Sequence, residues 1–110
     1  MIPATSDATP IYSELSDDPD LGGIVAIFVE EMPDRVAAIE RAFEAANWDS
    51  VQRLAHQMKG AAGSYGFDAI TPYALRLENA ARARNDHLEL RTALDEFVNV
   101  CQRISTGSGS

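Results

Sequence analysis

Apolar residues recur every three to four positions along most of the chain, which is the spacing of amphipathic helices. No run alternates apolar and polar residues in the way that a half-buried strand does. The last third shows the repeat most clearly, with spacings of four and three between Leu90, Leu94, Phe97, Cys101 and Ile104. Such a seam is typical of helices that pack in bundles. The whole pattern predicts helices over about residues 19–32, 33–46, 50–65, 68–84 and 87–104.

Capping and breaking residues mark the ends of these helices. Asp18, Asp49 and Asp86 each stand where an aspartate side chain caps the first turn of a helix. Gly66 is placed to end the third helix, because glycine readily adopts the left-handed conformation found after a last turn. Pro33 interrupts the first periodic stretch, since proline lacks a backbone N–H and its ring clashes with the preceding turn. We expect it to separate two helices or, as the alternative, to kink a single rod.

Four long helices with short connections predict an all-α fold, an antiparallel up-down-up-down four-helix bundle. The segment before Pro33 is expected to form a short additional N-terminal helix. Residues 1–17 lack apolar periodicity and are expected to be an N-terminal tail. Residues 18–104 form the predicted bundle domain, and residues 105–110, rich in Ser and Gly, are expected to be a flexible C-terminal tail.

The length, the net charge and the cysteine content of the chain exclude several classes of function. A chain of 110 residues is enough for one domain, and its net charge of −8 argues against nucleic acid as a partner. Cys101 is the only cysteine, which excludes an internal disulfide and a multi-thiolate metal site. We find no secretory signal and no apolar run near the roughly 20 residues that a membrane helix needs. We therefore expect a cytoplasmic monomer that binds other proteins and does not insert into membranes.

The helix predicted over 50–65 carries an unusual polar face. On a helical wheel with Val51 at 0°, His56 lies at about 140°, Gly60 at about 180° and Gly63 at about 120°, away from the apolar residues. Two interior glycines destabilise a helix by about 1.5–2 kcal/mol relative to alanines, a cost that a pure scaffold does not need. We interpret them as a bare strip on which a large partner approaches the imidazole.

The chemistry available at this face is phosphoryl transfer. Neutral histidine is a nucleophile that titrates near neutrality, so His56 is able to accept a phosphoryl group and pass it on. Lys59, the only lysine, lies one turn away, within reach of an anion attached to the ring. The nucleotide-binding patterns GxxxxGK[ST] and GxGxxG are both absent. The pattern therefore predicts a phosphocarrier and not an enzyme with ATP-dependent kinase activity of its own.

Residues 55–67, Ala-His-Gln-Met-Lys-Gly-Ala-Ala-Gly-Ser-Tyr-Gly-Phe, closely resemble the signature of histidine-containing phosphotransfer (HPt) domains. The resemblance covers about residues 19–104. It implies a module that relays phosphoryl groups in multistep two-component signalling. In that scheme His56 accepts the group through Nε2 from a receiver-domain aspartate and passes it to another receiver aspartate. Lys59 would steady the phosphoryl oxygens.

The resemblance also implies partners and a docking surface. The expected partners are response-regulator receiver domains and a hybrid sensor histidine kinase. No cofactor or metal is expected on this chain, because the receiver brings Mg²⁺. Gly60 and Gly63 would leave room for the docked receiver, and Gln57 would contact it nearby. From its place on the wheel, near 200°, Arg53 is a further candidate for this docking surface.

Other functions account for parts of the pattern. A receiver-binding adaptor or inhibitor that transfers no phosphate is the alternative that stays open, although such a module has no need of His56. A kinase dimerisation domain also carries a helical histidine, but the residues after His56 do not follow that class. A metal-binding bundle lacks support because no Glu-x-x-His pair occurs. We expect His87, Arg82 and Arg84 to lie on a solvated face.

Overall fold

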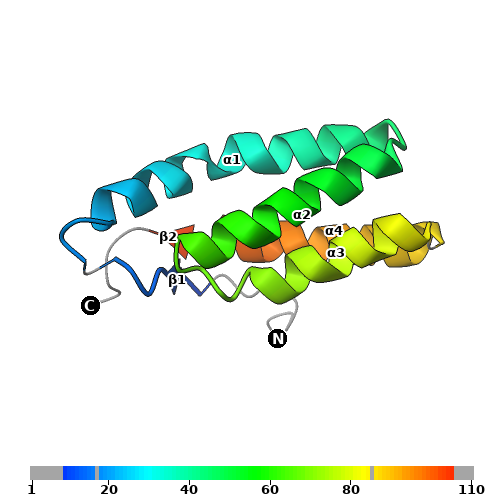
Figure 1. Cartoon of the computed structure of the whole chain (residues 1–110). Coiled ribbons are helices and arrows are strands. Elements are labelled where there is room, and N and C mark those ends of the chain that lie inside the picture. Colours follow the sequence, from blue (N-terminus) through cyan, green and yellow to red (C-terminus); the bar gives the residue numbers. More distant parts are fainter. Residues whose placement is uncertain (1–8, 17, 85, 106–110) are drawn as a thin grey trace.

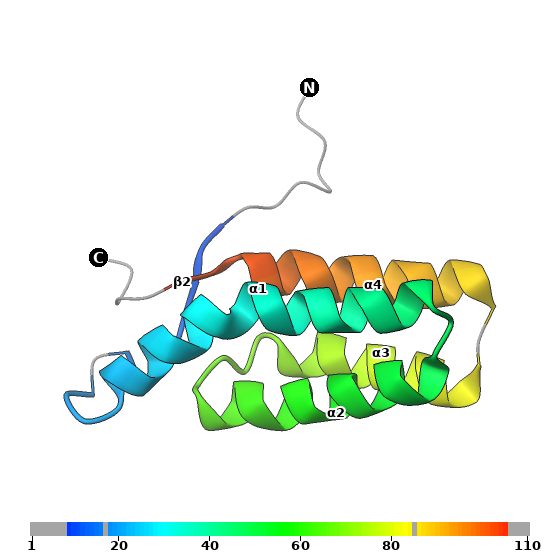
Figure 2. The ribbon, with the colours of Figure 1, turned by 90° about the horizontal axis from the view of Figure 1, so that it is seen from above.

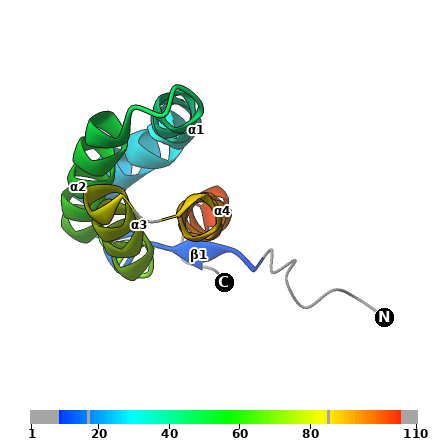
Figure 3. The same cartoon turned by 90° about the vertical axis from the view of Figure 1, so that its right-hand side faces the viewer.

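The computed structural model describes residues 9–16, 18–84 and 86–105. In these ranges four helices pack side by side, α1 (Gly22–Glu44), α2 (Trp48–Ser64), α3 (Thr71–Ala83) and α4 (His87–Gln102). Successive helices run in opposite directions, and the view along their axes places them around one interior (Figures 1, 2 and 3). The predicted all-α four-helix bundle is confirmed.

The first helix differs from the prediction. α1 passes through Pro33 without interruption, so the expected short additional helix is wrong and the alternative of a single rod is right. The physical reason is packing, because the residues on both sides of Pro33 continue one buried face. Its members are Val25, Phe28, Met32, Val36, Ile39 and Phe43. Burying these side chains outweighs the roughly 3 kcal/mol that a proline costs inside a helix.

The starts of two helices also fall on other residues than expected. α1 begins after Leu21 and not after Asp18, whose Oδ1 accepts the backbone N–H groups of Asp20 at 2.7 Å and Leu21 at 3.2 Å in the preceding turn. α2 is capped by Asn47, whose Oδ1 accepts the Ser50 N–H at 3.2 Å. Asp49 thus lies inside the first turn, where its negative charge faces the positive end of the helix dipole.

The other two end signals are confirmed. Asp86 Oδ1 accepts the backbone N–H of Glu89 at 2.9 Å at the start of α4. Gly66 follows α2 with a φ of +80°. Its N–H donates to the Gly63 carbonyl at 3.3 Å, and the Phe67 N–H donates to the Ala62 carbonyl at 2.8 Å. This pair of bonds satisfies the last carbonyls of α2 and directs the chain toward α3.

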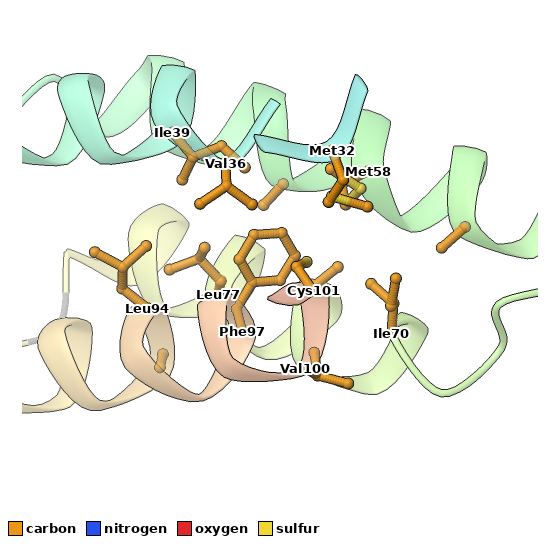
Figure 4. Packing of buried hydrophobic residues seen from close by; sticks show 14 of the residues in the cluster. Met32, Val36, Ile39, Met58, Ile70, Leu77, Leu94, Phe97, Val100 and Cys101 are labelled. Carbon is orange, nitrogen blue, oxygen red and sulfur yellow. The ribbon is translucent and has the colours of Figure 1, made fainter. Parts of the chain in front are cut away.

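The core lies between the four helices, with Phe97 of α4 at its centre among side chains of the other three (Figure 4). The apolar face predicted for α2 is buried at Val51, Ala55, Met58 and Ala62. Cys101 is also buried, and burial raises the pKa of its thiol to about 12. The thiol therefore stays protonated and acts as a small apolar core group.

A segment before α1 contacts the end of the bundle. Strand β1 (Ile11–Tyr12) pairs in parallel with β2 (Ile104–Ser105). Strands of two residues are too short to show an alternating pattern in the sequence. The buried Ser13 hydroxyl donates to the Tyr65 carbonyl and accepts the Leu15 N–H at 2.9 Å. Residues 9–16, which belong to the tail expected over 1–17, are thus bonded to the bundle. The remainder of both predicted tails, 1–8, 17 and 106–110, lies outside the described residues.

None of the helices in the described part of the chain combines the length and the apolar character required to cross a bilayer.

Candidate functional site

His56 lies in the middle of α2, on the face turned away from the core. Its side chain is 64% exposed. Gly60 and Gly63, one and two turns further on, are also exposed, and a Cβ atom added to either would meet nothing within 4 Å. The packing of the chain itself therefore does not require glycine at these positions. The predicted exposure of the imidazole beside a bare strip of backbone is confirmed.

A buried glutamate on α3 lies against the histidine. Glu78 is 3% exposed, and its Oε2 lies 2.9 Å from His56 Nδ1. Its other oxygen, Oε1, accepts a hydrogen bond from Lys59 Nζ at 3.0 Å. Arg82 Nη2 donates to Oε2 at 2.9 Å. One carboxylate thus connects the imidazole with two cationic side chains. We call these four residues, His56, Lys59, Glu78 and Arg82, the Glu78 network.

The charge of Glu78 determines which nitrogen of His56 is free. Burial raises the pKa of Glu78, but hydrogen bonds from Lys59 and His56 and their positive charges outweigh it and hold the pKa below its ordinary value. The carboxylate is therefore ionised at neutral pH and only accepts hydrogen bonds. Since it contacts Nδ1, the neutral ring carries its proton there and leaves the lone pair on Nε2. The exposed ring thus presents a nucleophilic nitrogen.

The second predicted residue, Lys59, lies on the flank of α2 with its side chain 28% exposed. Its ammonium group is engaged by Glu78 and is held close to the imidazole. A compact cation on a flexible stem remains able to turn toward an anion bound to the ring. The structure therefore brings together His56 and Lys59, as the sequence predicted, and adds the carboxylate that holds both.

The matching family model, Hpt domain, covers residues 23–107 of the chain. The chain belongs to the Hpt domain family. Hpt domains are phosphotransfer intermediates and not kinases, and they exchange phosphoryl groups with receiver domains in phosphorelays. No curated protein and no solved structure gave a match. Strand β1 precedes the matched range, so the segment before α1 is not part of the family match.

Arg53 and Gln57, two of the four docking candidates, lie on opposite flanks of α2 in this Hpt domain. Arg53 lines a shallow hollow together with His56 and Glu78, and its Nη2 donates to the Ser50 hydroxyl at 3.4 Å. Gln57 is exposed and lines a different hollow, of about 370 Å³, between α1 and α2. The structure thus places Arg53 beside the histidine and Gln57 on the far flank.

Arg82 is exposed, as expected of a solvated face, but its guanidinium is also hydrogen-bonded. Because residues four apart in a helix share a face, the guanidinium reaches Glu78 one turn before it. Its Nη1 also donates to Asn79 Oδ1 at 2.8 Å. Arg84 pairs with Asp49 Oδ1 at 2.7 Å across to α2. His87 is exposed as expected, with its ring centroid 5.8 Å from that of Phe43.

The sequence interpretation did not assign a role to Glu78, although a signal was present. Ala74 and Ala81 belong to the apolar repeat of their helix, and Glu78 follows the first by four residues and precedes the second by three. A carboxylate at such a position is buried and therefore needs charged or polar partners. Besides Arg82 on its own helix, His56 and Lys59 on the adjacent helix supply them, and their proximity to Glu78 depends on how α3 packs against α2.

A metal centre is not formed by the side chains described. Within residues 9–16, 18–84 and 86–105, no three His, Cys, Asp or Glu side chains are arranged to hold an ion.

Proposed function

We propose that this Hpt domain accepts a phosphoryl group on Nε2 of His56 from a receiver aspartate and donates it to the aspartate of another receiver. The observation that supports the proposal is the Nδ1 contact with the buried Glu78 carboxylate. It orients an exposed ring with its nucleophilic nitrogen outward, which is the arrangement that attack on an incoming phosphorus atom requires.

In this transfer one bond to phosphorus forms as another breaks, and no group of this chain leaves. The Nε2 lone pair forms the new P–N bond, and the P–O bond of the aspartyl phosphate breaks. The aspartate leaves as a carboxylate with the bonding electrons. The ring gains one positive charge while keeping its Nδ1 proton, and the Glu78 carboxylate at 2.9 Å stabilises this charge. Reversal of the same step passes the group to the second receiver.

The surrounding residues have separate parts in the proposal. Lys59 turns from Glu78 toward the phosphoryl oxygens and neutralises part of their charge. Gly60 and Gly63 let the receiver backbone approach the ring. Arg53 and Gln57 contact the docked receiver on the two flanks of α2. The receiver supplies Mg²⁺, so the chain itself needs no cofactor.

Local charge supports an acidic partner. The chain carries a net charge of −8, yet four of its nine basic residues occupy α2 and the C-terminal end of α3, namely Arg53, Lys59, Arg82 and Arg84. A basic region around His56 attracts the acidic surface near a receiver aspartate and accelerates encounter at low salt. A hybrid sensor histidine kinase as upstream partner, a monomeric state and a cytoplasmic location stay predictions.

A receiver-binding adaptor without transfer is the second candidate. Its binding face would use the same bare strip. However, docking alone does not need a buried carboxylate against the Nδ1 atom of the histidine, and burying that charge has a cost in free energy. The Glu78 network therefore favours transfer over passive binding.

The proposal is tested with a receiver domain that carries a radiolabelled phosphoryl group. The wild-type chain should acquire label, and His56→Gln should acquire none while circular dichroism shows an unchanged helical fold. The label should be lost in acid and retained in base, as expected for a P–N bond on histidine. Label on His56→Gln, or label that survives acid, would refute the assignment. Binding of the receiver without any label on the wild type would establish the adaptor.

A further inference from the structure

Arg82 has no part in the transfer as proposed so far, yet its guanidinium binds the same carboxylate oxygen as the imidazole. Arg82 Nη2 and His56 Nδ1 both lie 2.9 Å from the same atom, Glu78 Oε2. Arg82 comes from α3 whereas His56 and Lys59 come from α2. The two cations therefore reach the carboxylate that contacts the ring from two different helices. We propose that Arg82 is a second phosphoryl-binding residue, which forms a clamp with Lys59 around phosphorylated His56; this inference rests on the proposed function.

The charges of the Glu78 network support this role. One negative charge on Glu78 is matched by positive charges on Lys59 and Arg82, so the network has one surplus positive charge while His56 is neutral. A phosphoryl group brings a charge of about −1.5 to −2 at neutral pH. Lys59 alone cannot balance it. With Arg82 turned toward the phosphoryl oxygens and Glu78 facing the charged ring, both new charges have opposite partners.

The side chain of Arg82 also has the donors and the freedom that the role needs. It is 55% exposed, so it can rotate toward the ring face without displacing core residues. Of its five N–H donors, the bonds to Glu78 and Asn79 engage two. The planar guanidinium offers paired donors that match two oxygens of one phosphoryl group, which an ammonium does not.

The neighbouring arginines are less suited to this position. Arg84 is held by Asp49 at 2.7 Å and by the Ala81 carbonyl at 2.9 Å. Arg53 makes a hydrogen bond within its own helix, to Ser50. Neither shares an oxygen atom with the imidazole. Among the arginines of the described residues, Arg82 alone hydrogen-bonds the carboxylate that contacts His56.

Phosphoramidate, a small phosphodonor without a docking surface, separates phosphoryl binding from receiver docking. The Nε2 lone pair attacks phosphorus, the P–N bond of the donor breaks, and ammonia leaves with the bonding pair. Phosphohistidine formation on the full chain is followed by ³¹P NMR. Arg82→Gln should slow it about tenfold or more, the loss expected for one charge-assisted hydrogen bond. Arg82→Lys should restore part of the rate, and Lys59→Ala should be slowed as well.

Arg91→Gln is the matched control, because Arg91 forms an equivalent pair four residues along its helix, with Asp95 at 3.2 Å, on α4. Its rate should equal the wild-type rate. The tautomer of His56, read from ¹⁵N NMR, should be unchanged in Arg82→Gln, since Lys59 still holds Glu78. A slowed variant with an altered tautomer would show that Arg82 acts only through Glu78 and would overturn the inference.

Two further outcomes also overturn it. If Arg82→Gln is slowed with a receiver donor but not with phosphoramidate, Arg82 contacts the receiver and not the phosphoryl group. If the rate is unchanged with both donors, Arg82 has no part in the transfer. In both cases the wild type is still phosphorylated and the proposed function stands. Failure of the wild type to become phosphorylated by either donor would instead refute the proposed function itself.

Discussion

At the scale of single residues, the site depends on a pairing that joins two helices. His56 and Lys59 were recognisable from the sequence because the spacing of three places them on neighbouring positions of one helix face. Glu78 was not, because it lies 22 residues from His56 in the chain and meets it only across the α2–α3 contact. Once buried, the carboxylate orients the ring and holds Lys59. Glu78, to which the sequence assigned no role, thus positions His56 and Lys59, to which it did.

Glu78→Gln should destabilise the folded chain at neutral pH. The amide group of glutamine replaces one of the two acceptor oxygens by a donor, which then faces either Lys59 or the pair His56 and Arg82. We therefore expect the free energy of unfolding to fall by about 1–3 kcal/mol. Because the folded-state pKa of Glu78 lies below its ordinary value of 4.5, its contribution is present above that value. It is lost as the pH falls through the folded-state pKa.

Urea unfolding of both proteins across pH measures this difference. The wild type and Glu78→Gln should differ most at neutral pH and converge as the pH falls through the folded-state pKa of Glu78, which lies below 4.5. The variant should also accept phosphoryl groups more slowly from a receiver. A stability difference that is constant across pH would show that the ionised carboxylate does not stabilise the fold.

At the scale of elements, α2 combines two opposed requirements. One face is buried at Val51, Ala55, Met58 and Ala62, and this packing holds the helix in place. The other face carries Gly60 and Gly63, which weaken the helix although no neighbouring atom lies close enough to exclude a larger residue. α1 shows the converse, because packing keeps it helical through Pro33. Local signals therefore predicted the faces of helices correctly and a helix end at Pro33 wrongly.

Gly63→Gln should uncouple stability from docking. Glutamine has a helix propensity higher than that of glycine, so the free energy of unfolding should rise by roughly 0.5–1 kcal/mol. The added side chain projects from the open strip and should reduce receiver affinity by at least tenfold, measured by titration calorimetry.

Gly23→Gln on α1 provides the matched control for this prediction. A Cβ at Gly23 also meets nothing within 4 Å, and the residue lies on another helix, near its start. Receiver affinity should be unchanged in that variant. Equal affinity of Gly63→Gln and the wild type would contradict the interpretation of the strip as a docking surface.

At the scale of the whole molecule, the described N-terminal segment connects the C-terminal ends of α2 and α4 at one end of the bundle. β1 pairs with β2 after α4, while Ser13 and Glu14 bond to the carbonyls of Tyr65 and Gly66 after α2. The turn that ends α2 is thus supported from outside by residues that precede the family match. This explains why Gly66 is closely surrounded whereas Gly60 and Gly63 are open.

Gly66→Ala should destabilise the fold by about 2 kcal/mol or more, because alanine is strained at a φ of +80°. Its Cβ would also lie 2.5 Å from Ser13 Oγ. Adding Ser13→Ala removes that contact, so the double variant should cost less than the sum of the two single variants in urea unfolding. Gly60→Ala, which is open, should instead be stabilising. If the free-energy changes of the two single variants add up to that of the double variant, Ser13 does not contact the added Cβ at position 66.

The sequence by itself determined the helical faces, the exposed position of His56 beside two glycines, and Lys59 one turn away, because helical periodicity acts over a few residues. Tertiary structure decided that α1 continues through Pro33, that Glu78 and Arg82 join the histidine, and that residues 11–14 support the turn at Gly66. These outcomes depend on contacts between segments far apart in the chain. Their free energy comes from packing and from pairing of buried charge, which only the assembled bundle provides.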